Sequence, residues 1–135
     1  IQALRSIRDA LAPGGRAVID LFHPDPGFLA REIETPREVA RLTDPRDGAA
    51  CRFVQRARFD PVAQTIDDVL EEERTLPDGR TETRVRRNRY RFPYAEEMRL
   101  MCAVAGLSVE RVLGWFDGRP LEAGSREMVF VLRRS

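Results

Sequence analysis

The stretch Leu-Ala-Pro-Gly-Gly-Arg-Ala-Val-Ile-Asp-Leu-Phe, residues 11–22, constrains the fold of this chain more strongly than any other. The apolar residues that lead into it repeat at the spacing of one helix face: Leu4, Ile7 and Leu11. Pro13 cannot continue a helix, and the two glycines after it tolerate a positive φ, so we expect the helix Ile1–Leu11 to end there. Ala17–Phe22 is then a continuous, mostly apolar run, which is typical of a strand covered on both faces in an α/β protein.

The residues that follow this strand are candidates for a functional site. In open α/β sheets, ligands gather just past the carboxyl ends of the strands. His23, the single histidine of the chain, stands at that point, and we interpret it as a candidate catalytic base or substrate hydrogen-bond partner. Phe22 beside it is a candidate substrate contact. A loop histidine with local hydrogen bonds is the alternative, and Asp20 inside the strand fits a structural hydrogen bond as well as it fits catalysis.

Between residues 51 and 92, apolar and polar residues alternate with a period of two, which predicts antiparallel strands over 51–59, 64–76 and 81–92. Asp78-Gly79 is a two-residue hairpin signal that fixes a register between the last two of these strands. The register sets three acid–base pairs face to face: Glu73 with Arg84, Glu71 with Arg86 and Asp68 with Arg89. We therefore interpret these charged runs as matched faces of a sheet, and a nucleic-acid patch as the less favoured alternative.

The segments on either side of this sheet are predicted from local signals. Phe28–Leu42 has apolar spacing that allows two short helical pieces, interrupted by Pro36. Pro93 is expected to open the last helix at a position that tolerates proline. Leu107–Trp115 and Glu127–Leu132 are predicted as strands, and the linker between them is short for a parallel crossover, so they should be antiparallel neighbours.

Aromatic residues gather where the predicted sheet leads into the last helix. Tyr90 and Phe92 are candidate substrate-binding residues, because aromatic side chains commonly line small-molecule sites. Packing between the hairpin and the helix is the alternative, and it is the more favoured one. Trp115 and Phe116, after the following strand, allow the same two interpretations.

The net charge and the cysteine content limit the partners that the chain is expected to bind and the cellular setting that it fits. The formal net charge is only +1, so nothing draws the chain toward nucleic acid or an anionic membrane, and no apolar run is long enough to span a bilayer. Cys51 and Cys102 stand far apart and are expected to be small buried hydrophobes, which fits a reducing, cytoplasmic setting. Two cysteines and one histidine are too few for a structural zinc site, so no metal is expected.

Two parts of the chain carry a resemblance to a known family. Leu-Ala-Pro-Gly-Gly-Arg with its strand resembles the segment before the fifth strand of class I S-adenosylmethionine-dependent methyltransferases. Tyr94–Met98 through Ala105–Leu107, then Val112–Gly114 and Arg126–Arg133, resemble the last helix and last two strands of that family. The resemblance implies methyl transfer to a small molecule and the strand order fifth–seventh–sixth.

The implied fold class is α/β, or α+β for the fragment alone. It would be the C-terminal half of a Rossmann-like methyltransferase sheet, forming one domain over residues 1–135 with inserted antiparallel strands over 51–92. The alternative is a non-enzymatic, β-rich interaction or dimerisation domain, which would leave the strand Ala17–Phe22 apart from the last two strands.

The family binds its cofactor through a Gly-rich turn after the first strand and an acidic residue after the second, and neither is present here. We therefore expect this to be the C-terminal part of a longer enzyme. S-adenosylmethionine would bind to the full-length protein, with no cofactor-binding residue in this segment and no activity in the segment alone. The strand Ala17–Phe22 would lack its outer neighbour, so we expect the fragment to self-associate.

Overall fold

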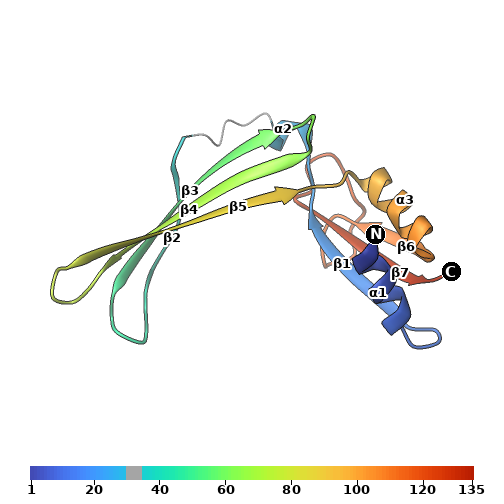
Figure 1. Ribbon diagram of the computed structural model, residues 1–135, viewed down its shortest axis with the longest axis horizontal. Coiled ribbons are helices and arrows are strands. Elements are labelled where there is room, and N and C mark those ends of the chain that lie inside the picture. Colours follow the sequence, from blue (N-terminus) through green and yellow to red (C-terminus); the bar gives the residue numbers. More distant parts are fainter. Residues whose placement is uncertain (30–34) are drawn as a thin grey trace. The chain divides into compact units, whose positions relative to one another are not determined.

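The computed structural model describes residues 1–29 and 35–135. The chain divides into two compact units (Figure 1). The first unit comprises residues 1–28 and 93–135, and the second comprises residues 29–92. No helix within the described ranges is long and apolar enough to cross a membrane.

The first unit contains a three-stranded antiparallel sheet with two longer helices. Its elements are α1 (Gln2–Ala10), β1 (Arg16–Phe22), the short α2 (Pro26–Leu29) at its boundary, α3 (Ala95–Ala105), β6 (Leu107–Leu113) and β7 (Glu127–Arg134). The strand order is β1-β7-β6, with β7 antiparallel to both neighbours. This confirms the predicted order, and it contradicts the interaction-domain alternative, which kept β1 apart from the last two strands.

The core of this unit lies between the sheet and the helices α1 and α3. Its buried members come from α1, α3, β6 and β7: Leu4, Met98, Cys102, Ala105, Leu107, Met128, Phe130 and Leu132. Helix α3 begins two residues later than predicted, because Tyr94 is its N-cap and accepts the first helical hydrogen bond from Met98, 2.9 Å away. Pro93 therefore precedes the helix. Burial raises the pKa of the Cys102 thiol, as expected for a cysteine that serves as a core hydrophobe.

The face of the sheet away from these helices is open along β1. Ala17, Ile19 and Leu21 pack against the core, whereas Val18 between them is 60 % exposed. The prediction that this strand is covered on both faces is therefore wrong for the residues described. β1 here behaves as a one-sided strand in which burial alternates with a period of two.

The second unit is a four-stranded antiparallel sheet in the order β2-β3-β4-β5. Its strands are β2 (Arg37–Thr43), β3 (Ala50–Asp60), β4 (Thr65–Thr75) and β5 (Thr81–Arg91). The helical pieces predicted over Phe28–Leu42 are wrong where the structure describes them beyond α2, because β2 pairs along β3; residues 30–34 lie outside the described ranges. The apolar spacing misled because Val39 and Leu42 are both exposed in the strand.

The register between β4 and β5 differs from the predicted one by one residue. The Leu76 N–H donates to the Arg80 carbonyl at 2.8 Å, and the Gly79 N–H donates to the Leu76 carbonyl at 2.9 Å. These bonds close a three-residue loop, Pro77-Asp78-Gly79, with proline second in a type I turn and Gly79 at φ +86°. The loop shifts the observed pairs to Glu72 with Arg84, Leu70 with Arg86 and Asp67 with Arg89, so the three predicted pairs are wrong.

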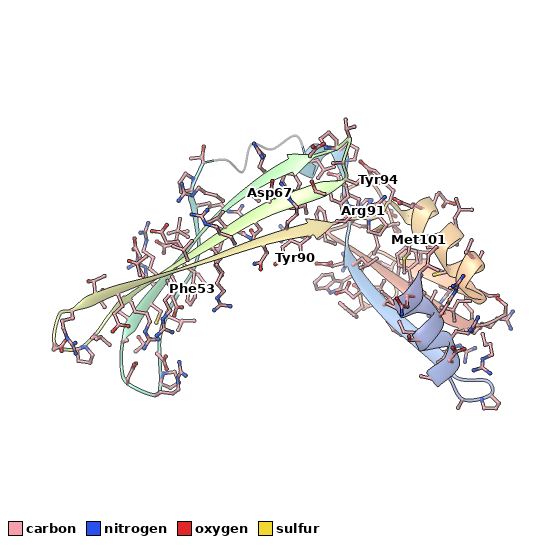
Figure 2. All side chains as sticks on the ribbon, viewed as in Figure 1. Phe53, Asp67, Tyr90, Arg91, Tyr94 and Met101 are labelled. Atoms are coloured by element: carbon pink, nitrogen blue, oxygen red, sulfur yellow. The ribbon has the colours of Figure 1, made fainter. Side chains whose placement is uncertain are left out.

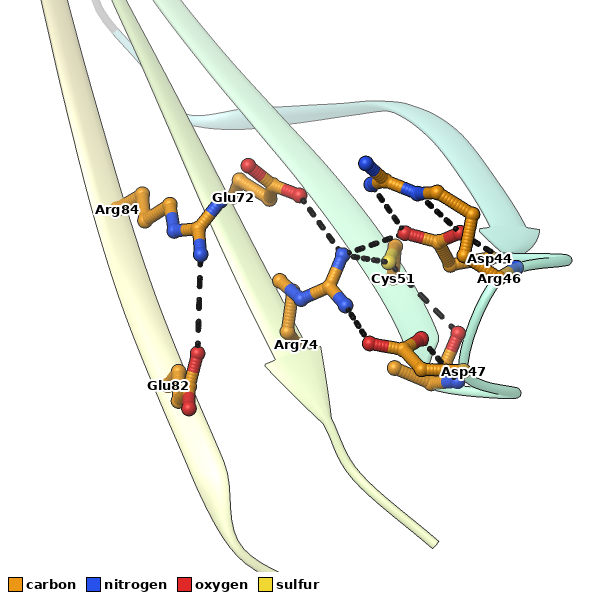
Figure 3. A network of polar contacts seen from close by, with 9 residues as sticks. Asp44, Arg46, Asp47, Cys51, Glu72, Arg74, Glu82 and Arg84 are labelled. Carbon is orange, nitrogen blue, oxygen red and sulfur yellow. Dashed lines mark hydrogen bonds and ion pairs between the residues drawn. The ribbon is translucent and has the colours of Figure 1, made fainter.

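A buried ionic cluster ties the β2–β3 turn to β4 (Figure 3). The Arg74 side chain is only 7 % exposed, and its Nη1 lies 2.8 Å from Asp44 Oδ2. The second guanidinium nitrogen bonds Asp47, and Cys51 Sγ lies 3.7 Å from Nη1. Hydrogen bonds from Arg46 and Arg74 hold the pKa of Asp44 far below its usual value. Each charge has a partner within the cluster, so we interpret it as structural.

Candidate functional site

The carboxyl ends of β1 and β6 lie at the same end of the sheet in the first unit, which we call its carboxyl edge. Because β1 and β6 are both antiparallel to β7, they run parallel to each other. His23 follows β1 at this edge, and the connection 114–126 begins there after β6 and returns into β7. The edge is the location at which α/β sheets bind ligands.

His23 is held in one orientation by the end of this connection. Its backbone N–H donates to the Arg126 carbonyl at 2.9 Å, and its ring Nδ1 lies 2.8 Å from the Ser125 carbonyl oxygen. A carbonyl oxygen only accepts hydrogen bonds, so we assign the proton of the neutral ring to Nδ1. The lone pair is then on Nε2, where the half-buried imidazole can accept a proton from a bound molecule.

Gly114, which has no side chain, allows the connection 114–126 to fold back toward His23. The Gly114 N–H donates to the Arg119 carbonyl at 3.0 Å, and the Ser125 hydroxyl accepts the Glu122 N–H at 3.0 Å. A Cβ at position 114 would lie 2.7 Å from the Pro120 carbonyl oxygen and would clash with Ser125 Oγ. The absent side chain is therefore what lets Ser125 reach its place against the histidine.

An open groove of about 730 Å³ lies along the same connection. It is lined by Gly114, Trp115, Arg119, Pro120, Glu122, Ala123, Gly124, Ser125 and Arg126. Trp115 is 43 % exposed and meets Phe116 edge-on, with ring centroids 5.6 Å apart. Ser125 and Arg126 both line the groove and accept hydrogen bonds from His23, which is not itself a lining residue.

A pair of carboxylates lies on the sheet beside this edge. Asp20 faces Val129 in the β1–β7 register, and Glu127 is two residues from Val129, so both acids lie on one face. Burial and the negative charge of Asp20 raise the pKa of Glu127. Sequence reasoning considered Asp20 and missed Glu127, because only the antiparallel register brings the two together.

The structure places the four predicted site residues in pairs. Phe22 and His23 lie in the first unit, where Phe22 is paired with Glu127 in the ladder. Tyr90 and Phe92 lie in the second unit, where Tyr90 is 50 % exposed and Phe92 is 3 % exposed. The Phe92 N–H donates to the Gln64 carbonyl at 3.0 Å. Phe92 is therefore buried, whereas Tyr90 is available at the surface.

No group of three or more His, Cys, Asp or Glu side chains in residues 1–29 and 35–135 could hold a metal ion. The glycine pair 14–15 also does not fit a nucleotide cofactor. The Gly15 N–H closes a turn onto the Ala12 carbonyl at 2.9 Å, and this turn leads into the amino end of β1, away from His23. Nucleotide-binding glycine turns instead follow a strand and open a helix. The Gly14-Gly15 turn therefore does not have the geometry of a nucleotide-binding turn.

Comparison with known proteins identifies relatives of the chain. It is 34 % identical over 136 residues to the cypemycin N-terminal methyltransferase of a Streptomyces species, covering 99 % of this chain and 50 % of that protein. The structure of the CcbJ methyltransferase from Streptomyces caelestis matches with a TM-score of 0.74 and 30 % identity, over 98 % of this chain and 51 % of CcbJ. No family model matches the chain.

The fold recurs in a more distant structure. SAM-bound CalS10, an amino pentose methyltransferase from Micromonospora echinaspora, matches with a TM-score of 0.68 and 19 % identity, over 98 % of this chain and 49 % of that one. The chain thus spans about half the length of the relatives it matches. These comparisons confirm the resemblance inferred from the two sequence segments.

Proposed function

We propose that this chain, a homologue of S-adenosylmethionine-dependent methyltransferases, is the C-terminal part of such an enzyme and supplies its proton-accepting group. The observation that carries the proposal is the orientation of His23, whose Nδ1 is fixed by the Ser125 carbonyl at 2.8 Å so that Nε2 is the basic atom. This base lies just past the carboxyl end of β1, which is where an α/β enzyme is expected to bind its substrate.

The chemistry asks little of the protein beyond orientation and a base. The cofactor supplies an electrophilic methyl group, and the acceptor atom of the substrate loses a proton as it becomes methylated. In our proposal His23 takes that proton, Ser125 holds the ring while it does so, and the groove beside Trp115 positions the substrate. Glu127 and Asp20 set the charge of the neighbouring sheet face.

The dimensions of the groove support a small-molecule substrate. Its volume of about 730 Å³ falls within the range of roughly 300–1,000 Å³ that such sites occupy. Two of the relatives are named as a cypemycin N-terminal methyltransferase and an amino pentose methyltransferase, and these names support a small acceptor. We propose that the enzyme is cytoplasmic and that residues 1–135 form one domain of it, its C-terminal part, with the strands of residues 51–92 as an insertion.

The test is an assay of the complete protein that contains this chain. Incubated with S-adenosylmethionine and a panel of small peptides and amino sugars, it is expected to release S-adenosylhomocysteine only when an acceptor is present. The 135-residue chain alone is expected to bind no S-adenosylmethionine in a calorimetric titration. Acceptor-independent release, no release with any acceptor, or micromolar binding by the chain alone would each contradict part of the proposal.

A further inference from the structure

The outer edge of β5 is an open hydrogen-bonding surface of the second unit. β5 is the last strand in the order β2-β3-β4-β5, and no strand in the part of the chain that the structure describes pairs with its other side (Figure 1). All eleven residues of β5 are exposed. An edge strand of this length presents a row of unpaired backbone groups, on which an extended segment of another chain can dock.

The ladder with β4 determines which backbone groups of β5 point outward. The Leu76 N–H donates to the Arg80 carbonyl at one end of the ladder, and the Phe92 N–H donates to the Gln64 carbonyl at the other. Hydrogen-bonded pairs alternate along an antiparallel ladder, and the register between these ends is continuous. The even-numbered residues of β5 are therefore bonded to β4. The odd-numbered ones direct their N–H and C=O groups to the open edge: Thr83, Val85, Arg87 and Arg89.

Two adjacent arginines in the middle of β5 have no acidic partner. Arg86 faces Leu70 across the ladder, and Arg87 faces Val69. Both arginines are exposed, and among the residues that the structure describes neither guanidinium group forms an ion pair. The other arginines of the strand each have a partner: Glu82 for Arg84, Asp67 for Arg89 and Gln64 for Arg91.

The nearest acids of β4 are engaged by other side chains. Their partners are Arg89 for Asp67, the Gln55 amide for Asp68, Arg56 for Glu71 and Arg74 for Glu72. Figure 2 shows the two faces of the sheet, with Asp67 on one and Tyr90 on the other. Arg87 shares the face of Asp67, and Arg86 shares that of Tyr90. The edge therefore carries one guanidinium group on each face that is available to an outside partner.

The charge of this edge selects one kind of occupant. A second copy that paired through β5 would set arginines against arginines. The other edge strand of the sheet, β2, contains Arg37 and Arg41 and a single acid, Glu38. Arg41 and Arg52 already bind that acid. Like charges opposite each other destabilise a strand pair and opposite charges stabilise it, so an acidic strand is favoured over another copy of this chain.

We propose that the outer edge of β5 binds an extended acidic segment of a partner protein as a fifth strand of this sheet. Two consecutive acidic side chains of that segment meet Arg86 on one face and Arg87 on the other. Its backbone pairs with the outward groups of Val85, Arg87 and Arg89. This interaction surface goes beyond the proposed methyl transfer and does not depend on it.

A matched pair of peptides tests the charge requirement on the complete protein. One is a capped peptide, Thr-Val-Thr-Glu-Glu-Val-Thr-Val, and the other has Gln in place of each Glu. Fluorescence titration is expected to show the acidic peptide binding about five- to tenfold more tightly, as two cross-strand ion pairs predict, with a smaller difference at high salt. Arg86→Gln combined with Arg87→Gln is expected to remove the preference. Arg5→Gln combined with Arg111→Gln removes the same charge from exposed positions of the first unit and should keep it.

A proline variant tests whether the peptide binds as a strand. Val85→Pro removes one outward N–H and leaves the hydrogen bonds to β4 in place, which is a position at which an edge strand accepts proline. It is expected to weaken acidic-peptide binding at least about tenfold, whereas Val85→Thr, which keeps the N–H, should bind like the parent. If Val85→Pro impairs folding, amide hydrogen exchange at Val85 and Arg87 of the parent protein takes its place and should slow when the peptide binds.

Three results would overturn the proposal. They are equal affinity for the two peptides, a preference that survives the loss of Arg86 and Arg87, and acidic-peptide binding that neither needs the Val85 N–H nor slows its exchange. A single-stranded oligonucleotide represents the other class of partner, because its phosphates need the arginines and not the outward N–H groups. Oligonucleotide binding that is lost with the two arginines, together with equal affinity for the two peptides, would identify a nucleic-acid surface instead.

Discussion

The imidazole Nδ1 of His23 and the carbonyl oxygen of Ser125 lie 2.8 Å apart, which joins the end of β1 to the residue that leads into β7. Their sequence positions are 102 residues apart. The contact fixes both the tautomer and the orientation of the only imidazole in the chain, and it depends on a backbone atom, which a substitution of the Ser125 side chain would not remove directly.

This contact predicts how two substitutions of His23 should differ. In His23→Asn the amide nitrogen can keep the bond to Ser125 but no base remains, so kcat of the complete enzyme should fall by roughly 10²–10⁴ with little change in melting temperature. In His23→Gln the amide reaches toward the Nε2 position and lacks the Ser125 bond. Steady-state kinetics with thermal melting separates the two effects. Unchanged kcat in a folded His23→Asn enzyme would exclude His23 as the base.

The raised pKa of Glu127 predicts a stabilising substitution. A raised carboxyl pKa means that the ionised form is disfavoured in the folded state, so stability is highest below the ordinary carboxyl pKa and is lost as pH rises from that value through the raised one. Glu127→Gln removes the charge next to Asp20 and should raise the melting temperature by about 1–3 °C at pH 7–8. The gain should shrink near pH 4. Glu122→Gln, on the exposed connection, is the control and should show neither effect.

The acid limb of the stability curve should report the ion pairs of the second unit. Hydrogen bonds from Arg41 and Arg52 lower the pKa of Glu38 from 4.5 to about 2, and those from Arg89 and Arg58 lower that of Asp67 to about 2. A lowered pKa contributes stability above the unfolded value, and that stability is lost as pH falls from about 4.5 toward 2. Circular dichroism melts should show Glu38→Gln with a shallower decline over this range than the parent. Glu96→Gln on α3 should leave the decline unchanged.

The buried cluster around Arg74 predicts a large loss of stability on substitution. Arg74→Leu would leave Asp44, whose side chain is 6 % exposed, without its buried partner, and breaking a buried pair from one side is strongly destabilising. We expect the melting temperature to fall by on the order of 10 °C. Arg80→Leu removes an exposed pair with Asp78 on the neighbouring loop and should change it by no more than a degree or two. Equal effects would show that the cluster adds nothing beyond a surface pair.

The outer edge of β1 predicts self-association of the 135-residue chain. β1 pairs with β7 on one side, and no strand within the described ranges pairs with its other edge. Sedimentation should therefore show species larger than the 15.4 kDa monomer. Val18→Lys is the suitable edge variant, because Val18 is 60 % exposed whereas Ile19 packs against the core, and it should shift the chain toward monomer without unfolding it. A clean monomer for the parent chain would refute the prediction.

The sequence predicts the first unit well because its signals are local or shared with a family. The Pro-Gly-Gly turn, the helix stripe ending in Ala105 and the two closing strands each carry their own pattern, and the family resemblance supplies the strand order. Boundaries differ by one or two residues, as for β6, which ends at Leu113 rather than Trp115. These are the positions at which chain ends leave a ladder, and no propensity marks them sharply.

The features that were not predicted from the sequence share a different physical origin. β2 is a strand because it pairs with β3. Its apolar residues Val39 and Leu42 are exposed to solvent, so no local pattern of apolar residues predicts the strand. Glu127 becomes notable only when the β1–β7 register sets it beside Asp20. Such properties arise from pairing between distant segments, which a single sequence does not specify by periodicity.

Removal of one codon from the start of β5, with the Pro77-Asp78-Gly79 turn kept, would shift β5 by one position along β4. Since opposed residues share a face, each side chain of β5 would cross to the other side of the sheet. Tyr90 would then stand opposite Asp67, and Arg89 would stand opposite Asp68, between Ile66 and Leu70. In genes related to this one, insertions and deletions at the start of β5 should therefore preserve parity, and changes of two codons should outnumber changes of one.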